Sequence, residues 1–153
     1  MNTIESKFLS SPSKFEQWRG YLQRSVRADK RLPDQVFQAG FGKFLFGEFR
    51  TVLNADFGPQ IRELAQLSKD SEILMAVLIP DPIKHHEAYG TYNWVELSVA
   101  EFVAEYAEAL DFKPNGNIAD AVIHVASVVV WLPKSLSWVI WGERGRGVYI
   151  RGF

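Results

Sequence analysis

The sequence predicts an α+β fold in which N-terminal helices pack on a small, mainly antiparallel sheet that ends in a C-terminal β-hairpin. Helical spacing of apolar residues dominates the first third of the chain, and a continuous apolar run at residues 73–79 is typical of a buried strand. Two strand-like segments then flank a glycine-bounded turn near the C-terminus. The 153 residues, 47% hydrophobic and 23% charged, predict a single globular domain over residues 1–153.

The N-terminal segments carry helix signals. A capping box at Ser13 predicts a first helix over residues 14–27. A second helix is predicted from a cap at Asp34 to the stop signal Gly58-Pro59, because apolar residues keep a helical period across this segment. The three glycines inside it oppose that assignment, since each costs about 1 kcal/mol relative to alanine within a helix. Pro59 suits the first turn of a third, short helix.

The middle of the chain combines strand and helix signals. Residues 73–79 predict a buried strand, and the Pro-Asp-Pro sequence at 80–82 predicts a loop after it. Residues 92–97 predict another strand. A second capping box at Ser98 predicts a helix. The apolar stripe of this helix is formed by Val99, Phe102, Val103, Tyr106 and Leu110.

Residues 118–132 fit two structures. Their valines favour a strand, whereas apolar residues at helical spacing and a cap at Asn117 favour a helix. We predict a buried helix, because a segment of more than about 12 residues favours helix over strand, and we keep the strand as the alternative. Pro133 ends either structure.

The C-terminus predicts a β-hairpin. Residues 137–141 and 146–151 have strand composition and flank the turn-compatible tetrapeptide Gly142-Glu143-Arg144-Gly145. We expect Trp138 or Trp141 to be largely buried in this hairpin.

Composition excludes several classes of function. The absence of cysteine removes disulfides, thiolate metal sites and cysteine nucleophiles. The stretch Met1–Ser11 lacks the apolar core of a secretory signal, and the apolar residues 118–132 are too short and too polar to span a bilayer. A net charge of −1 opposes general nucleic-acid binding. We therefore expect a cytoplasmic protein with neither a membrane nor a nucleic acid as its partner.

No motif typical of an active site is present, so we predict no catalytic residue, no metal and no cofactor. The best candidate for a metal site is His85-His86-Glu87, with His124 as a further ligand. Adjacent histidines in an extended loop point apart, and His124 lies in a segment predicted to be buried, so we interpret them as two solvated loop histidines and one core histidine. Carboxylates for hydrolysis could come from Glu96, Glu101 and Glu105, but an exposed helix face explains the last two more simply.

Two groups of residues are candidates for binding another protein. Glu101, Glu105 and Glu108 form an acidic stripe opposite the apolar stripe of their helix, and such a stripe is either a solvated face or a docking surface for a basic protein. The second group is an aromatic anchor. Its members are Tyr89, Tyr92 and Trp94, for which core packing is the simpler interpretation.

The C-terminal sequence supports a family resemblance. Leu132-Pro133, the segment Ser137-Trp138-Val139-Ile140-Trp141-Gly142-Glu143-Arg144 and the closing Val148-Tyr149-Ile150 resemble the C-termini of small bacterial immunity-type proteins that accompany polymorphic toxins. Val139 and Glu143 depart from the alanine and aspartate usual in that pattern. The resemblance implies a non-enzymatic cytoplasmic protein that neutralises a cognate toxin, with the tryptophans packing the sheet and Arg144 in the turn.

The leading hypothesis is therefore a protein-binding immunity factor whose partner is a basic toxin domain. The alternatives are a small enzyme or ligand-binding domain with an aromatic-lined pocket, and an adaptor subunit.

Overall fold

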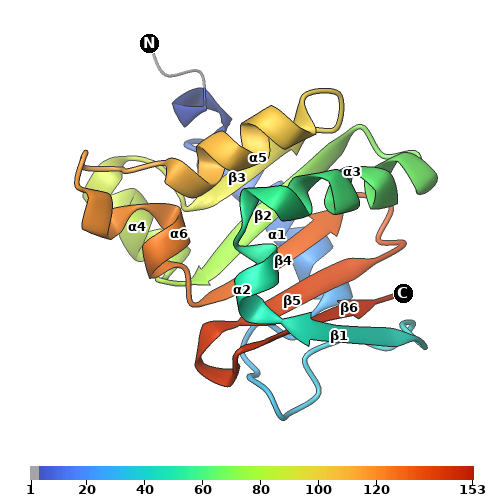
Figure 1. Ribbon diagram of the computed structural model, residues 1–153. Helices are drawn as coiled ribbons and strands as arrows, with labels where there is room; N and C mark the ends of the chain where they lie inside the picture. The colour runs from blue at the N-terminus through green and yellow to red at the C-terminus, as the bar shows by residue number, and fades with distance from the viewer. Residues whose placement is uncertain (1–3) are drawn as a thin grey trace.

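A six-stranded antiparallel sheet organises residues 4–153, which the computed structural model describes (Figure 1). The spatial order of the strands is β1-β6-β5-β4-β2-β3, so β1 and β3 form the two edges. The strands are β1 (Phe44–Glu48), β2 (Glu72–Ile79), β3 (Trp94–Ser98), β4 (Val128–Pro133), β5 (Val139–Glu143) and β6 (Val148–Gly152). Residues 1–3 lie outside the described residues. The prediction that Met1–Ser11 lacks a secretory signal falls partly on them. The α+β prediction is confirmed.

Helices cover both faces of the sheet. They are α1 (Pro12–Ser25), α2 (Phe49–Val52), α3 (Gly58–Leu67), α4 (Pro82–Tyr89), α5 (Phe102–Asp111) and α6 (Val122–Val125). Figure 1 shows α1 behind the sheet and α2, α3, α5 and α6 in front of it, with α4 beside α6. Each face therefore has its own apolar core, one beneath α1 and one beneath α2, α3, α5 and α6.

The strands β2 and β4 are buried on both faces. Along β2, Ile73 and Met75 enter the core beneath α3 and α5, and Leu74 and Ala76 enter the core beneath α1. This alternation explains why residues 73–79 are apolar without interruption. Every residue of β4 is buried, because β4 lies between β2 and β5.

The predicted helix over residues 118–132 is wrong. Only the 3-10 turn Ile118–Asp120 and the single-turn α6 are helical, and the chain then continues into β4. A strand buried on both faces is apolar at every position, so a helical period can be found in it without any helix. The valines, which favour strands, were the better guide.

The predicted second helix, from Asp34 to residue 57, is also wrong. Residues 44–48 form the edge strand β1, and only α2 and the 3-10 turn Ala55–Phe57 are helical. Gly47 permits the strand pairing, since a Cβ at this position would overlap the ring of Tyr149 on β6. Gly40 has a φ of 115°, which a helix does not allow.

Most other elements are where the sequence predicts them. Helix α1 begins slightly earlier than predicted, because Ser11 rather than Ser13 accepts the capping bond from the Lys14 N–H. The short helix after Pro59, the strands at residues 73–79 and 92–97 and the helix after Ser98 are present as α3, β2, β3 and α5. The predicted loop after residue 80 is wrong, because Asp81 caps α4 and Gly90, with a φ of 80°, ends it.

The predicted C-terminal hairpin is confirmed, but its turn is displaced: Gly142 and Glu143 belong to β5, and Arg144–Arg146 with Gly147 form the connection. Strands β5 and β6 pair antiparallel from Val139 opposite Gly152 to Glu143 opposite Val148. Trp138 is 4% exposed and Trp141 is fully buried. The hairpin residues that carry the family resemblance are thus part of the sheet and its core.

Glu143 and Arg144 attach this hairpin to distant segments. The Glu143 carboxylate is buried, and its Oε1 accepts hydrogen bonds from the Leu32 N–H at 2.6 Å and from the Trp141 indole at 3.1 Å. Arg144 lies in the connection to β6 and donates to the carbonyls of Ile123 and Ala126, at the end of α6. Both side chains therefore stabilise the fold.

We predict that Glu143→Ala lowers the free energy of unfolding by about 1–3 kcal/mol, because it leaves one buried and one partly buried N–H group without an acceptor. Glu143→Gln should recover most of this loss, since its amide oxygen can accept the same two bonds. Urea denaturation of the three proteins measures the difference. Equal destabilisation by both substitutions would show that the carboxylate charge, and not its hydrogen bonds, matters.

Candidate functional site

Glu105 and Glu108 of the predicted acidic stripe lie on α5, and Glu101 is the residue just before it. Helix α5 packs against α3 and β3. Glu101 and Glu108 are exposed, as predicted. Glu105 is not a free surface charge: its side chain is 16% exposed, its carboxylate accepts the Ser98 N–H at 2.8 Å, and it lies 3.8 Å from the Lys7 ammonium group. Glu105 therefore holds the start of α5, and only Glu101 and Glu108 are available to a partner.

The predicted aromatic anchor is mostly buried. Tyr92 and Trp94 are 6% and 2% exposed, so the expectation of exposed binding residues is wrong for both and the core-packing interpretation is confirmed. Tyr92 stacks on Phe15 of α1, and the Trp94 indole donates to the Val77 carbonyl at 3.1 Å. Tyr89, at the end of α4, is 43% exposed.

The histidines do not converge. His85 and His86 lie on α4 rather than in the predicted loop, and their rings bond to the carbonyls of Thr91 and Ser10. His124 is exposed on α6, so the expected core histidine is wrong. Among residues 4–153, no cluster of three or more His, Asp or Glu side chains is arranged to hold a metal ion.

A carboxylate pair that sequence reasoning did not identify lies beneath α1. Glu96 on β3 accepts the Trp18 indole N–H at 2.6 Å and the Lys14 ammonium at 3.2 Å. Burial alone would raise the pKa of Glu96, but hydrogen bonds from Glu72, Trp18 and Lys14 lower it to about 2. The hydrogen bond to Glu96, together with burial, raises the pKa of Glu72 above its usual value. Through these bonds Glu96 connects α1 to the sheet.

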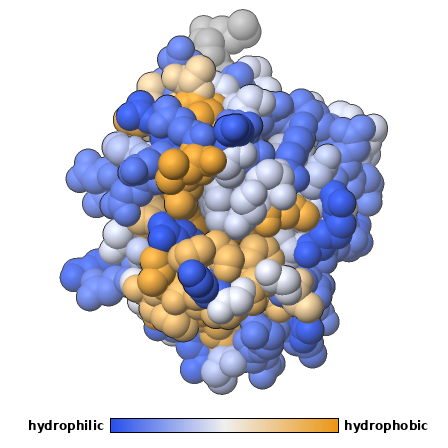
Figure 2. Space-filling model, turned by 90° about the vertical axis from the view of Figure 1, so that its right-hand side faces the viewer, coloured by the Kyte–Doolittle hydropathy of each residue, from blue (hydrophilic) through white to orange (hydrophobic). Residues whose placement is uncertain are grey.

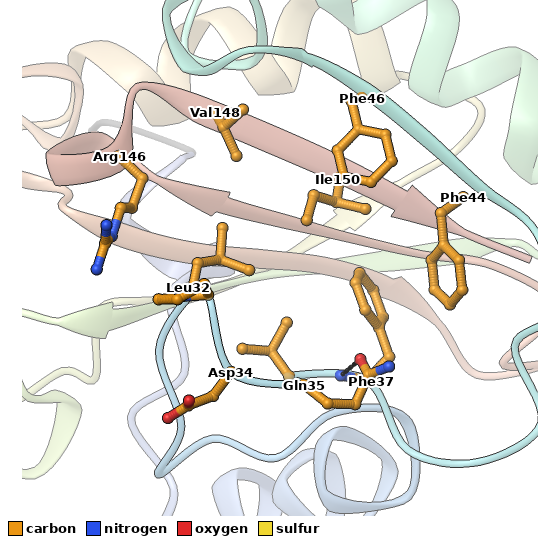
Figure 3. Close-up of a pocket in the computed structure, with 11 residues that line it drawn as sticks. Leu32, Asp34, Gln35, Phe37, Phe44, Phe46, Arg146, Val148 and Ile150 are labelled. Carbon is orange, nitrogen blue, oxygen red and sulfur yellow. Dashed lines mark hydrogen bonds between the residues drawn. The ribbon is translucent and has the colours of Figure 1, made fainter.

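An apolar groove lies at the opposite edge of the sheet, between β1 and β6 on one side and the loop before β1 on the other (Figure 3). Its volume is about 510 Å³. It is lined by Leu32, Pro33, Asp34, Gln35, Val36, Phe37, Phe44, Phe46, Arg146, Val148 and Ile150. We call this feature the β1 groove.

The strands and the loop give the β1 groove two walls. Figure 3 shows Phe44, Phe46, Val148 and Ile150 along the strands, with Asp34 and Gln35 on the loop across from them and Arg146 at one end. Phe37 of the loop contacts the strand wall, and the centroids of the Phe37 and Phe44 rings are 5.1 Å apart. Charge is confined to the rim, so the floor offers only apolar contact.

The free edge of β1 borders this groove. Lys43 and Phe153 exchange both backbone hydrogen bonds, and the register places Leu45 opposite Arg151 and Gly47 opposite Tyr149. Because bonded and non-bonded pairs alternate in an antiparallel ladder, the N–H and C=O groups of Phe44, Phe46 and Glu48 are directed away from β6. In the described part of the chain, no strand pairs with them.

Large apolar side chains are exposed at this edge. Phe46 is 68% exposed and Leu45 is 50% exposed. Figure 2, which views the molecule from the side of β1 and the C-terminus, shows apolar atoms gathered over much of this face. Isolated exposed apolar residues are ordinary on protein surfaces, but a continuous patch beside an unpaired strand is typical of an interaction site.

Sequence reasoning missed the β1 groove because it assigned Phe44 and Phe46 to a helix. The available signal was the Phe-Leu-Phe run between Gly42 and Gly47, which is short and strand-like. Residues 32–37 form the other wall of the groove, and only the tertiary structure brings this loop next to β1 and β6.

Searches for related proteins find no matching family model, no matching curated protein and no matching solved structure. None of the helices in residues 4–153 has the length and apolar character needed to cross a membrane. The geometry of the chain is therefore the basis for any proposal about its function.

We predict that Glu96 titrates at a pH of about 2 and that Lys14→Met raises its pKa, because one hydrogen bond and one positive charge are lost. Arg19→Met is the matched control, since Arg19 lies on the same helix but pairs with Glu16. Carbon-13 NMR of the side-chain carboxyl groups measures both. Titration of Glu96 near 4.5 in the wild-type protein would contradict this description of the pair.

Proposed function

We propose that the protein acts by binding another protein, and that an extended segment of the partner pairs with the free edge of β1 while its side chains enter the β1 groove. The observation that carries this proposal is the unpaired edge of β1 beside an apolar groove. Strand addition to a sheet edge combines main-chain hydrogen bonds, which give affinity, with pockets for alternate side chains, which give specificity.

The edge offers both kinds of contact. Phe44, Phe46 and Glu48 direct their N–H and C=O groups outward, so an added strand can form a regular ladder with them. The added strand would also cover Phe46 and Leu45, which lie on opposite faces of the sheet. Side chains that point to the groove side would then contact Phe46 and Val148.

Two positive charges near β1 favour acidic residues in the partner segment, while the single carboxylate that lines the groove, Asp34, lies on the loop wall across from the strands. Lys43 precedes β1 and Arg146 stands at one end of the groove, and neither is ion-paired within residues 4–153. Glu48 is already paired with Arg50 at 2.6 Å. An apolar segment that is flanked by Asp or Glu complements this surface.

The proposed biological role is that of an immunity protein, which binds a cognate bacterial toxin in the cytoplasm and neutralises it without catalysis. Its support is the C-terminal resemblance together with the position of the motif. Strand β6 pairs with β5 on one side and with β1 on the other. The hairpin that contains the motif therefore holds β1 in place at the edge of the sheet.

The acidic residues Glu101, just before α5, and Glu108, on α5, form a second surface on which a partner could dock. It lies near β3, at the edge of the sheet opposite β1. A basic toxin domain docked on Glu101 and Glu108 would therefore contact a different part of the molecule, and the two possibilities can be tested separately.

We expect Phe46→Thr to weaken partner binding about tenfold, equivalent to roughly 1.4 kcal/mol, because it removes a central apolar contact. Phe46→Pro should weaken binding further, since it also removes an outward N–H while leaving the β1–β6 ladder intact. Leu67→Thr on α3 is the matched control, because Leu67 is 75% exposed and distant in the fold from β1. Affinities are measured with purified proteins after the partner is recovered with the wild-type chain.

The same experiment tests the proposed immunity role and the assignment of the binding surface to the β1 edge. The recovered partner should arrest growth when it is expressed alone, and wild-type protein but not the Phe46→Pro variant should restore growth. A non-toxic partner would contradict the immunity role but not protein binding. Binding that resists both Phe46 substitutions but is lost on combining Glu101→Lys and Glu108→Lys would instead assign the contact to α5.

A further inference from the structure

A second pocket lies between α4, α6 and the end of β2, far along the sheet from the β1 groove. Figure 1 shows α4 and α6 beside each other, and residues of both helices line the pocket. Its volume is about 280 Å³, and Val77, Ala88, Val122 and Val125 supply apolar walls. We call it the α4–α6 pocket.

Asn93 lines this pocket and carries a buried acceptor atom that has no partner within residues 4–153. The residue is 4% exposed and lines the pocket, and its Nδ2 donates to the Pro80 carbonyl at 2.8 Å. This bond fixes the orientation of the amide, because only the NH₂ group can donate to a carbonyl. The Asn93 Oδ1 atom is consequently an acceptor, and within the described residues it is buried without a hydrogen-bond partner. Buried acceptors in native proteins are nearly always satisfied, so this atom indicates a missing donor.

His85 adds a second acceptor. Its Nδ1 lies 2.6 Å from the Thr91 carbonyl, so Nδ1 carries the proton and Nε2 is left with a lone pair. In residues 4–153, no hydrogen bond occupies Nε2. Burial lowers the pKa of His85 below its usual value, although the hydrogen bond to Thr91 opposes this shift, and the ring is therefore neutral at pH 7.

The remaining polar groups favour a positive charge. Asp81 and Asp120 line the pocket, and each uses one carboxylate oxygen in a local bond, to the Lys84 N–H and to the Asn115 amide respectively. Lys84 is the single cationic side chain among the lining residues. Acceptors thus predominate, and a ligand that fits must bring donors.

We propose that the α4–α6 pocket binds a small organic cation, a primary amine or an alkylguanidinium, whose N–H groups donate to Asn93 Oδ1 and His85 Nε2. Its alkyl part lies against the valine side chains, and the two aspartates balance its charge. The same head groups occur in free small molecules and in the lysine and arginine side chains of a bound protein. The site does not depend on the proposed function of the β1 groove.

The test uses n-butylguanidinium and n-butylammonium chloride as probes, with n-butanol and sodium butyrate as neutral and anionic comparators. We expect saturable binding of the two cations by NMR, with shifts concentrated at the Asn93 side-chain amide and the His85 ring. Butyrate should not bind. Equal binding of n-butanol, or no saturable shift with either cation, would overturn the proposal and leave a pocket whose acceptors are satisfied by water.

Ala88→Leu narrows the pocket from α4 and should weaken cation binding at least tenfold. Ala104→Leu is the matched control, because Ala104 is also an exposed alanine inside a helix, but on α5. Equal affinities of the two variants would place the cation elsewhere and contradict the proposal. Capped lysine and arginine amides then separate the two sources: binding as tight as that of the butyl probes indicates a protein side chain, and weaker binding indicates a free small molecule.

Discussion

The burial of one sheet on both of its faces is the constraint on which the rest of the structure depends. Strands β2 and β4 direct alternate residues into two separate cores, so each face needs its own cover. On one face α2, α3, α5 and α6 provide it. On the other, α1 reaches β3 through Trp18 and Phe15, while the loop containing Phe37 covers β6 and β1. A loop covers less completely than a helix, and the β1 groove is the result.

The C-terminal motif has a structural explanation within this arrangement. Trp138 and Trp141 fill the two cores on opposite sides of the sheet. Glu143 fixes the loop at Leu32, and Arg144 fixes the end of α6. The motif residues therefore determine where β6 lies and, through β6, where the β1 edge is exposed.

Local signals in the sequence predicted the elements that local forces determine. The hairpin has a turn between two strands, α1 has a cap, and α3 has a proline in its first turn. Ser98 accepts the Glu101 N–H just before α5. Strand β4 is buried on both faces, so its sequence shows no alternation of apolar and polar residues. The run around Phe44 has helical spacing but forms β1, because Gly47 leaves room for Tyr149 of β6. The Asp81 cap and Gly90 were sufficient to predict α4, but the Pro-Asp-Pro sequence was interpreted as a loop. Of the site residues, Glu101, Glu108 and Tyr89 are exposed as expected, whereas the β1 groove and the α4–α6 pocket assemble residues far apart in the chain.

The proposed binding at β1 requires that the outward backbone groups of this edge strand are unpaired in the free protein. Hydrogen exchange of the β1 amides, measured residue by residue by NMR, tests this most directly. We expect the exchange rates to alternate along β1 in the free protein. The amides of Leu45 and Gly47 are protected by β6, and those of Phe44, Phe46 and Glu48 exchange rapidly until a partner is added. Protection of all five amides in the isolated chain at low concentration would show that the edge is already covered, and would rule out the addition of a partner strand to β1.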